Sequence, residues 1–353
     1  MTNPEHNTLV ILTPGFPASE TDSTCLPMQQ NFVKAIKRNY PNINIIVLSF
    51  QYPYIVQTYT WFGITIMSFN GQNKGGLARL LLRLKLNRAL KQINSSNKII
   101  GILSFWYNEC AWVGKTFAGK NNLKHYCWIF GQDARPANTY PKSLNLNAGE
   151  LIALSDFLQG EFEKNHGIKP GVVIPSGIDS TQFKTAIKEK DIDLLAAGSL
   201  IPLKQFEIFI EVVVAIKKQL PGIKAAIIGS GPEKDKLKTL IEKHKLQPNI
   251  TFAGELAYPT VLQWMQRTKV FLHPSSYEGF SGVCLEAIAA GARVISFCKP
   301  MKHDIEQWHI ATNKGEMKDL ALEILQTPAI DFKNTIPFCI KDTAKKIMKL
   351  FEI

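Results

Sequence analysis

Two glutamates, Glu278 and Glu286, lie eight positions apart in a stretch that reads FLHPSSYEGFSGVCLEAIAAG from residue 271 to residue 291. At this spacing one carboxylate stands before a predicted helix and the other about one turn into it, so the pair could hold two ends of one ligand. Both could also be solvated surface side chains. Glu286, however, is flanked by the apolar residues 284–285 and 287–288, where an unpaired carboxylate would be costly to bury, and this setting favours a ligand site.

The elements around these glutamates are a strand, a loop and a helix. The run Val270–Leu272 predicts the end of a buried strand, which breaks at His273-Pro274. Ser281 suits the N-cap of the following helix, and Gly291 suits the left-handed residue after its end. In an open parallel sheet such a loop lies where ligands bind, and the first N–H groups of the helix can hold an anion. We therefore expect a phosphate group here.

The segment from Glu278 to Glu286, with the GARVIS strand at 291–296, closely resembles the nucleotide-sugar site of retaining GT-B-fold glycosyltransferases of family 4, the glycosyl transferases group 1. Three upstream segments resemble the family in order and spacing: residues 197–204 (AGSLIPLK), 228–233 (IGSGPE) and 250–255 (ITFAGE). The resemblance covers the second half of the chain. It implies an α/β, GT-B architecture, in which two doubly wound Rossmann-like domains face each other across a cleft.

The resemblance also implies roles for individual residues. Glu286 would accept hydrogen bonds from the ribose hydroxyls of a nucleoside-diphosphate sugar, and Glu278 would hold the sugar hydroxyls. Lys204 would supply positive charge to the leaving diphosphate. The backbone would provide the remaining contacts: Phe280, Ser281, Gly282 and Val283 at the diphosphate, Gly254 and Glu255 at the base, and Gly15 and Phe16 from the first domain.

Two positions depart from the family pattern. Ser199 stands where the family has an arginine, and Gln132 stands where many relatives have a histidine that faces the sugar, beside Asp133. Ser199 can donate a hydrogen bond but supplies no charge, and Gln132 can bond a hydroxyl but cannot carry a proton. Arg135 and Lys299 are candidates to replace the missing charge. Asp133 and Arg135 could equally form a local ion pair in a turn.

The length of 353 residues suits two domains, and 45% hydrophobic residues suffice for two cores. We expect an N-terminal Rossmann-like, acceptor-side domain at 1–182, a nucleotide-sugar domain at 183–336 and, at 337–353, a terminal helix that returns to the first domain. The lysine-rich stretch 181–190 predicts the linker.

In the first half, apolar runs that alternate with helical patterns predict a doubly wound parallel sheet. The predicted strands are 8–13, 43–50, 99–103, 125–130, 151–153 and 172–174. Residues 52–93 fit this pattern least. They contain an aromatic run, 54–69, and then the basic segment 77–88, whose apolar residues form no single stripe. That segment predicts either a half-buried helix with snorkelling cations or a surface that contacts an acceptor or an anionic membrane.

The net charge of +12 fits nucleic acid, an anionic membrane or a phosphorylated ligand. No nucleic-acid motif is present, so we expect no nucleic-acid partner. No stretch approaches the roughly 20 apolar residues of a membrane span, and the first residues lack a signal-peptide pattern. We therefore expect a cytoplasmic protein, which could act at the inner face of the membrane.

No metal or other cofactor is expected. Asp191-Ile-Asp193 matches the DxD pattern of metal-binding glycosyltransferases, but it precedes a predicted strand and so belongs at the amino end of the sheet. The six cysteines are scattered and predict reduced thiols.

The resemblance therefore implies a retaining, metal-independent glycosyltransferase that moves a hexosyl-type sugar from a nucleoside diphosphate to a glycan or lipid-linked acceptor in surface polysaccharide synthesis. Two alternatives remain open. Ser199 and Gln132 would suit a catalytically silent, nucleotide-binding partner subunit of a glycosyltransferase complex. A nucleotide-sugar epimerase of the same fold would act on the donor without an acceptor.

Overall fold

The computed structural model describes residues 7–183, 189–328 and 330–353. The chain divides into two compact units. The N-terminal unit comprises Met1–Gly177 and Ile340–Ile353, and the C-terminal unit comprises Ile178–Cys339. The sequence indicates boundaries a few residues away, after 182 and 336. Part of the predicted linker, residues 184–188, and the first six residues, which carry no predicted signal peptide, lie outside the described ranges.

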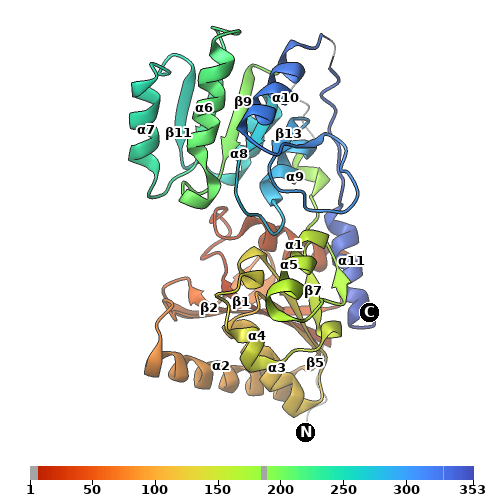
Figure 1. The fold of residues 1–353 in the computed structure, drawn as a ribbon. Coiled ribbons are helices and arrows are strands. Elements are labelled where there is room, and N and C mark those ends of the chain that lie inside the picture. The colour runs from red at the N-terminus through yellow and green to blue at the C-terminus, as the bar shows by residue number, and fades with distance from the viewer. Residues whose placement is uncertain (1–6, 184–188, 329) are drawn as a thin grey trace. The chain divides into compact units, whose positions relative to one another are not determined.

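The N-terminal unit is built on a sheet of eight strands within the described residues, in the order β3-β4-β2-β1-β5-β6-β7-β8 (Figure 1). Every neighbouring pair is parallel except β3 with β4. The strands are β1 (Asn7–Gly15), β2 (Asn44–Tyr52), β3 (Val56–Trp61), β4 (Ile64–Phe69), β5 (Lys98–Phe105), β6 (His125–Ile129), β7 (Leu151–Ala153) and β8 (Val172–Val173).

Helices cover both faces of this sheet. On β5, Ile102 packs into the core that α2 and α3 share with β1 and β2. Its neighbour Gly101 faces the other way, where a Cβ would overlap the ring of Phe351, so α11 covers the opposite face beside α1. The helices are α1 (Pro27–Asn39), α2 (Gly76–Ser96), α3 (Glu109–Asn121), α4 (Tyr140–Leu144), α5 (Asp156–His166) and α11 (Ile340–Leu350).

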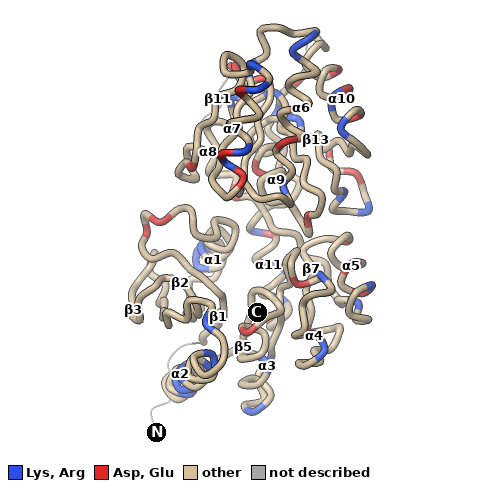
Figure 2. Tube along the Cα trace, turned by 60° about the vertical axis from the view of Figure 1, so that its left-hand side comes forward, with Lys and Arg blue, Asp and Glu red and all other residues tan. Residues whose placement is uncertain are grey.

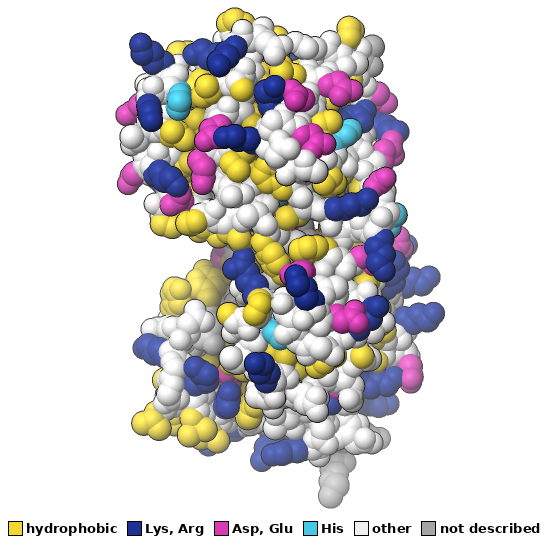
Figure 3. Space-filling view, viewed as in Figure 1, with side chains coloured by type: hydrophobic (Ala, Val, Ile, Leu, Met, Phe, Trp, Pro, Cys, Tyr) yellow, Lys and Arg dark blue, Asp and Glu magenta, His cyan; other side chains and the backbone are white. Residues whose placement is uncertain are grey.

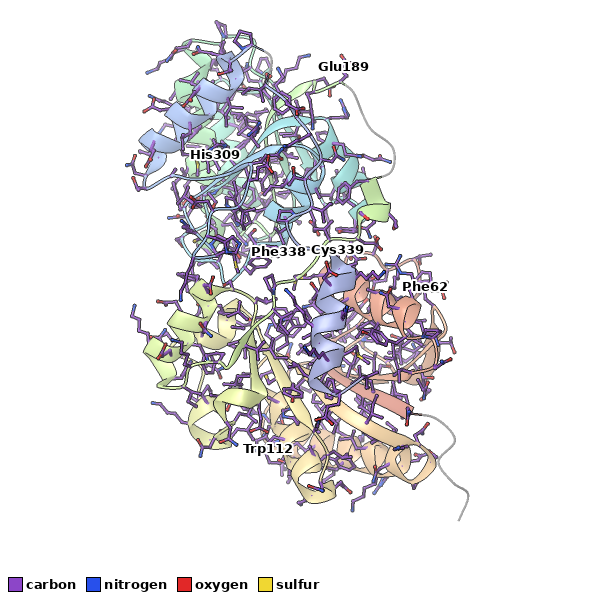
Figure 4. The ribbon with its side chains drawn as sticks, turned by 90° about the vertical axis from the view of Figure 1, so that its right-hand side faces the viewer. Phe62, Trp112, Glu189, His309, Phe338 and Cys339 are labelled. Atoms are coloured by element: carbon purple, nitrogen blue, oxygen red, sulfur yellow. The ribbon has the colours of Figure 1, made fainter. Side chains whose placement is uncertain are left out.

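Most of the segment that the sequence left unassigned, 54–69, forms the β3–β4 hairpin, which begins at Val56. Trp61 pairs with Ile64 across a two-residue turn, in which Phe62 and Gly63 have φ of +45° and +71°. Positive φ at both turn residues is the signature of a type I′ turn. Figure 4 labels Phe62 at this turn.

The C-terminal unit has a fully parallel sheet in the order β11-β10-β9-β12-β13-β14, counted over the described residues. The strands are β9 (Ile192–Ala197), β10 (Ala225–Ile228), β11 (Ile250–Gly254), β12 (Thr268–His273), β13 (Arg293–Ser296) and β14 (Trp308–Ile310). The chain order reverses between β9 and β12. Their carboxyl ends therefore form the topological switch point, where ligands bind in open α/β sheets.

Two helical layers enclose this second sheet. The helices α6, α7 and α10 share one apolar core with the strands, and α8 and α9 pack together and against β12. These helices are α6 (Phe206–Lys217), α7 (Lys234–Lys243), α8 (Tyr258–Gln266), α9 (Gly282–Ala289) and α10 (Lys314–Gln326). Two units of this construction confirm the predicted α/β fold class.

The chain enters and leaves the C-terminal unit at adjacent points. Ile178 forms a parallel bridge with Cys339, and the Ile178 N–H donates to the Phe338 carbonyl at 2.8 Å. The chain then continues from Phe338 and Cys339 directly into α11 (Figure 4).

The loops after β9 and β10 approach each other closely at two glycines. Gly198 and Gly229 have φ of +148° and +143°, and a Cβ on Gly229 would overlap the carbonyl oxygen of Gly198. We predict that Gly229→Ala lowers the free energy of unfolding by at least about 2 kcal/mol, because it adds backbone strain to this overlap. Denaturant unfolding measures the change.

Gly222→Ala is the matched control, because a Cβ at Gly222 would meet nothing within 4 Å. It should change the free energy of unfolding by less than about 0.5 kcal/mol. Equal stability of the two variants would contradict the close approach of the loops.

Candidate functional site

Lys204 and Glu278 meet at the switch point of the C-terminal unit. Lys204 ends a short 3-10 turn in the loop after β9, and Glu278 lies in the loop between β12 and α9. Their side chains form an ion pair between Lys204 Nζ and Glu278 Oε1, and both are largely buried. The backbone holds the two loops together, since Ser276 N–H donates to the Leu203 carbonyl at 3.0 Å. The fold therefore brings together two residues that are 74 positions apart.

His273, the last residue of β12, forms a hydrogen bond with Glu278. Its Nε2 lies 3.0 Å from Glu278 Oε1, and because an ionised carboxylate only accepts, the imidazole carries its proton on Nε2. Burial alone would raise the pKa of Glu278. The hydrogen bond from His273 and the charge of Lys204 outweigh burial and lower the pKa to about 2. Glu278 is therefore ionised at neutral pH.

Helix α9 begins directly after Ser281, at the predicted position, but Ser281 does not cap it with its side chain. The Ser281 hydroxyl lies instead 3.4 Å from His273 Nε2. The first N–H groups of a helix have no carbonyl partner within the helix, so the backbone of Gly282 and Val283 is available to an anion at this end. Gly291, with φ of +82°, is the left-handed residue that the sequence predicts after the helix.

Glu286 lies on α9 and is held by α8. The hydroxyl of Tyr258, the first residue of α8, donates to Glu286 Oε1 at 2.9 Å. Burial raises the pKa of Glu286 to about 7, although the hydrogen bond from Tyr258 acts in the opposite direction. The two glutamates thus differ in charge behaviour: Glu278 is fixed as an anion, and Glu286 gains and loses its proton near neutral pH.

The neighbouring strands β9, β10 and β11 end in loops at the same edge of the sheet. Ser199 follows β9 and is exposed, and Glu255 is exposed after β11. Gly254 has φ of +72°, and its carbonyl accepts from Gly229 N–H at 2.8 Å. These loops supply polar backbone and a hydroxyl to the edge, while Lys204 supplies the positive charge.

In the N-terminal unit, Gly15 ends β1 and Phe16 begins the following loop. The Phe16 side chain is fully buried, with its ring 4.9 Å from the ring of Trp61. Its N–H donates to the Tyr52 carbonyl at 3.3 Å. Phe16 therefore anchors the loop that follows Gly15.

Gln132 and Asp133 form part of a 3-10 turn after β6, at Gly131–Ala134. Asp133 is buried, and its Oδ2 accepts from the Phe130 N–H at 2.8 Å. Burial raises the pKa of Asp133 to about 7, against the lowering effect of this hydrogen bond. Gln132 is exposed. Asp133 thus stabilises the turn, and Gln132 is the member of the pair that solvent or a ligand can reach.

A polar pocket of about 170 Å³ in the N-terminal unit was not predicted from the sequence. It lies beside Pro14 at the end of β1 and beside Glu109 at the start of α3. Glu109 is buried and accepts from Tyr140 Oη at 2.7 Å and from the guanidinium of Arg83. The detectable signal is a carboxylate in the largely apolar and aromatic run FWYNECAW at 105–112.

The DxD pattern at 191–193 lies at the amino end of β9. Asp191 pairs with Arg267, and Asp193 accepts from Lys269 Nζ at 2.8 Å. Within the described residues, no group of three or more His, Cys, Asp or Glu side chains is arranged to hold a metal ion. Lys299, a candidate to replace the missing arginine, pairs with Asp304 at 2.5 Å.

Comparison with known proteins links this site to a family. Residues 177–324 match the family described as Glycosyl transferases group 1. The chain is 28% identical over 180 residues to glycogen synthase of Mycobacterium tuberculosis, covering 49% of this chain and 43% of the relative. It is 31% identical over 127 residues to the gpi3 subunit of phosphatidylinositol N-acetylglucosaminyltransferase of Schizosaccharomyces pombe, covering 35% and 28%. The chain thus spans less than half the length of these relatives.

Among solved structures, the protein is similar to Anabaena Alr3699/HepE in complex with UDP and glucose. The two share a TM-score of 0.69 at 17% identity, over 98% of each chain. This similarity shows the fold: both proteins have the two-unit GT-B architecture.

The raised pKa of Glu286 predicts a pH-dependent stability. The usual pKa of glutamate is 4.5, and that of folded Glu286 is about 7. Between these two pH values folded Glu286 keeps a proton that the unfolded chain releases. The free energy of unfolding therefore falls as the pH rises through this window. We predict that Glu286→Gln removes this loss and gains on the order of 1–2 kcal/mol relative to wild type between pH 5 and pH 8. Denaturant unfolding at both pH values measures it.

Glu255→Gln, at an exposed glutamate on the same edge, serves as the control and should show no such gain. A constant difference between Glu286→Gln and wild type at pH 5 and pH 8 would refute the assignment.

Proposed function

Because residues 177–324 carry the glycosyl transferases group 1 domain, we propose that this protein is a retaining, metal-independent glycosyltransferase. It moves a sugar from a nucleoside diphosphate to a glycan or lipid-linked acceptor in surface polysaccharide synthesis. The observation that supports this most is the meeting of Lys204, Glu278 and the start of α9 at the switch point of the sheet.

The charges at the switch point suit a donor that consists of a sugar and a diphosphate. The Lys204 ammonium has three donors, so it can bond a phosphate oxygen while it still holds Glu278. The N-terminus of α9, with about half an elementary charge, faces the same loop as a second positive element. Glu278 is ionised and accepts hydrogen bonds, which suits the hydroxyls of the transferred sugar. Glu286, one helix turn further, suits the ribose hydroxyls.

The proposed transfer retains the configuration at the anomeric carbon. The acceptor oxygen attacks the anomeric carbon from the side on which the diphosphate leaves, the bond from carbon to phosphate oxygen breaks, and that phosphate oxygen takes the acceptor's proton. In this scheme the departing phosphate is therefore the base. Lys204 and the N–H groups of α9 stabilise the charge that develops on the leaving group.

The N-terminal unit would receive the acceptor. Its pocket beside Pro14 carries Arg79, Glu109 and Tyr140, a mixture of donors and acceptors that suits hydroxyls or a phosphate. The matched gpi3 subunit belongs to phosphatidylinositol N-acetylglucosaminyltransferase, and the HepE structure contains UDP and glucose. UDP-glucose is therefore the first donor to test, with lipid-linked and free glycans as acceptors.

Donor binding can be tested apart from transfer. A nucleoside diphosphate at about 100 times its dissociation constant should stabilise the protein by roughly 2.7 kcal/mol. We predict such a shift in thermal melting for one among UDP, GDP and ADP, and its loss in Glu286→Ala. Glu242→Ala, at an exposed glutamate on α7, should keep the shift.

The role of Lys204 in turnover requires a kinetic test. We predict that Lys204→Met lowers kcat for transfer about 10²- to 10³-fold, with a smaller effect on donor affinity, because the positive charge acts mainly on the leaving group. Lys314→Met, at an exposed lysine paired with Glu211, should stay within twofold of wild type.

Ser199 favours one alternative, the catalytically silent partner subunit, because an exposed serine supplies no charge where the family has arginine. Nucleotide binding without transfer to any cell-derived acceptor, in the presence of the purified protein alone, would support that alternative over the enzyme. Wild-type turnover that Lys204→Met leaves unchanged would contradict the silent subunit and also the role proposed for Lys204.

A further inference from the structure

Helix α2 has two apolar faces, of which the core uses only one. Leu82, Leu86, Leu90 and Ile93 are buried and pack with β1, β2 and α3. This inner face accounts for the position of the helix on the sheet. It also explains why the segment shows no single stripe in sequence: a second set of leucines points elsewhere.

The second set faces away from the protein. Leu77, Leu80, Leu81 and Leu84 are 79%, 52%, 56% and 57% exposed. At about 100° per residue these four leucines fall within an arc of roughly 100°, opposite the buried face. Figure 3 shows hydrophobic side chains gathered at the lower left, where Figure 1 places the first turns of α2. Single exposed leucines are ordinary, but four adjacent ones form a surface that marks an interaction site.

Further along α2, the same outer face carries positively charged side chains. Arg88 and Lys91 fall within the same arc as the four leucines, one to two turns further along, and Lys85 borders it. The helix contains five basic residues and no acidic residue, and Figure 2 shows it marked in blue. Arg83 is bound to Glu109, but Lys85, Arg88 and Lys91 are exposed. The outer face thus combines exposed leucines with exposed cations.

A second apolar stretch lies at the same end of the sheet. Tyr54, Ile55 and Val56 are 67%, 52% and 61% exposed, at the start of the edge strand β3. Val56 pairs with Phe69, from which the chain passes through one short loop into α2. Both stretches therefore follow the carboxyl ends of neighbouring strands.

We propose that the outer face of α2, together with Tyr54–Val56, docks on a membrane surface that contains anionic lipids. The leucines enter the boundary between headgroups and acyl chains while Lys85, Arg88 and Lys91 contact lipid phosphates, as in helices that lie in the membrane plane. None of the helices in the described ranges combines the length and the apolar composition that a membrane span requires.

The charge pattern selects a membrane over the other occupants of an apolar face. A second copy of the chain, related by a two-fold axis, would bring like charges of the two α2 helices together, which disfavours self-association. An anionic bilayer offers negative charge along the entire length of the helix and an apolar layer beneath it. This inference goes beyond the proposed function and does not depend on the donor site.

The test is sedimentation of the full chain with vesicles of phosphatidylcholine and phosphatidylglycerol in equal parts, and of phosphatidylcholine alone. We expect binding to the anionic vesicles to be at least about tenfold stronger, and to weaken as salt rises from 0.1 to 0.5 M, since screening reduces the attraction. The variant L77Q/L80Q/L81Q/L84Q and the variant R88Q/K91Q should each lose about tenfold or more in affinity. All these positions are exposed, so both variants should melt as wild type does.

The control K234Q/K243Q removes the two exposed lysines at the ends of α7 and should bind as wild type does. Failure of the wild type to bind anionic vesicles at low salt overturns the proposal. Binding of the leucine variant with wild-type affinity also overturns the proposal, because the contact would then be a nonspecific attraction between charges. A wild-type dimer in sedimentation velocity that the leucine variant abolishes, without vesicle binding by either, would assign this face to self-association instead. No readout involves donor or transfer, so these outcomes are independent of the proposed enzyme activity.

Discussion

The ion pair between Lys204 and Glu278 is the contact on which the candidate site depends. It joins the loops that leave the two strands at which the sheet reverses its order, and His273 fixes Glu278 from the strand itself. Exposed ion pairs contribute little to stability, but this pair is largely buried and shares a hydrogen bond, so its two charges are held in one geometry. The site therefore presents an oriented anion and cation side by side before any ligand arrives.

The two glutamates show how environment divides the work between chemically identical groups. Both are removed from water, but only Glu278 has a cation and an imidazole N–H beside it. Glu286 accepts from the neutral phenol of Tyr258, and burial prevails in its pKa. A ligand that brings hydroxyl donors to Glu286 would favour its ionised form, so donor binding and proton release at this residue are coupled.

The motif from Glu278 to Glu286 could be found from the sequence because it consists of particular residue types at a fixed local spacing. The partners that hold it could not: His273 was noted only as the end of a strand, and Tyr258 reaches Glu286 from another helix. Ser281 was placed correctly at the helix start, but the nearby imidazole competes for its hydroxyl. Such partners depend on which loops the sheet order brings together, and local spacing carries no information on that order.

The fold followed from the sequence wherever apolar runs were buried on both sides, as in β1, where Leu9 to Leu12 are inaccessible to solvent. It was missed at 54–69, where an edge hairpin exposes alternate residues and turns at Phe62 and Gly63. In α2 the helix was expected, but its leucines fall on two opposite faces, so periodicity alone could not separate the core from the surface.

The placement of α11 has a consequence for the synthesis of the chain. The helix covers the sheet of the N-terminal unit at Gly101, yet the ribosome makes it only after the whole of Ile178–Cys339. At about 5–20 residues per second, that interval lasts roughly ten to thirty seconds. The C-terminal unit is continuous in sequence and can fold during this time, while the apolar face that will receive Phe351 stays open to chaperones. The unit that is translated first is therefore completed last.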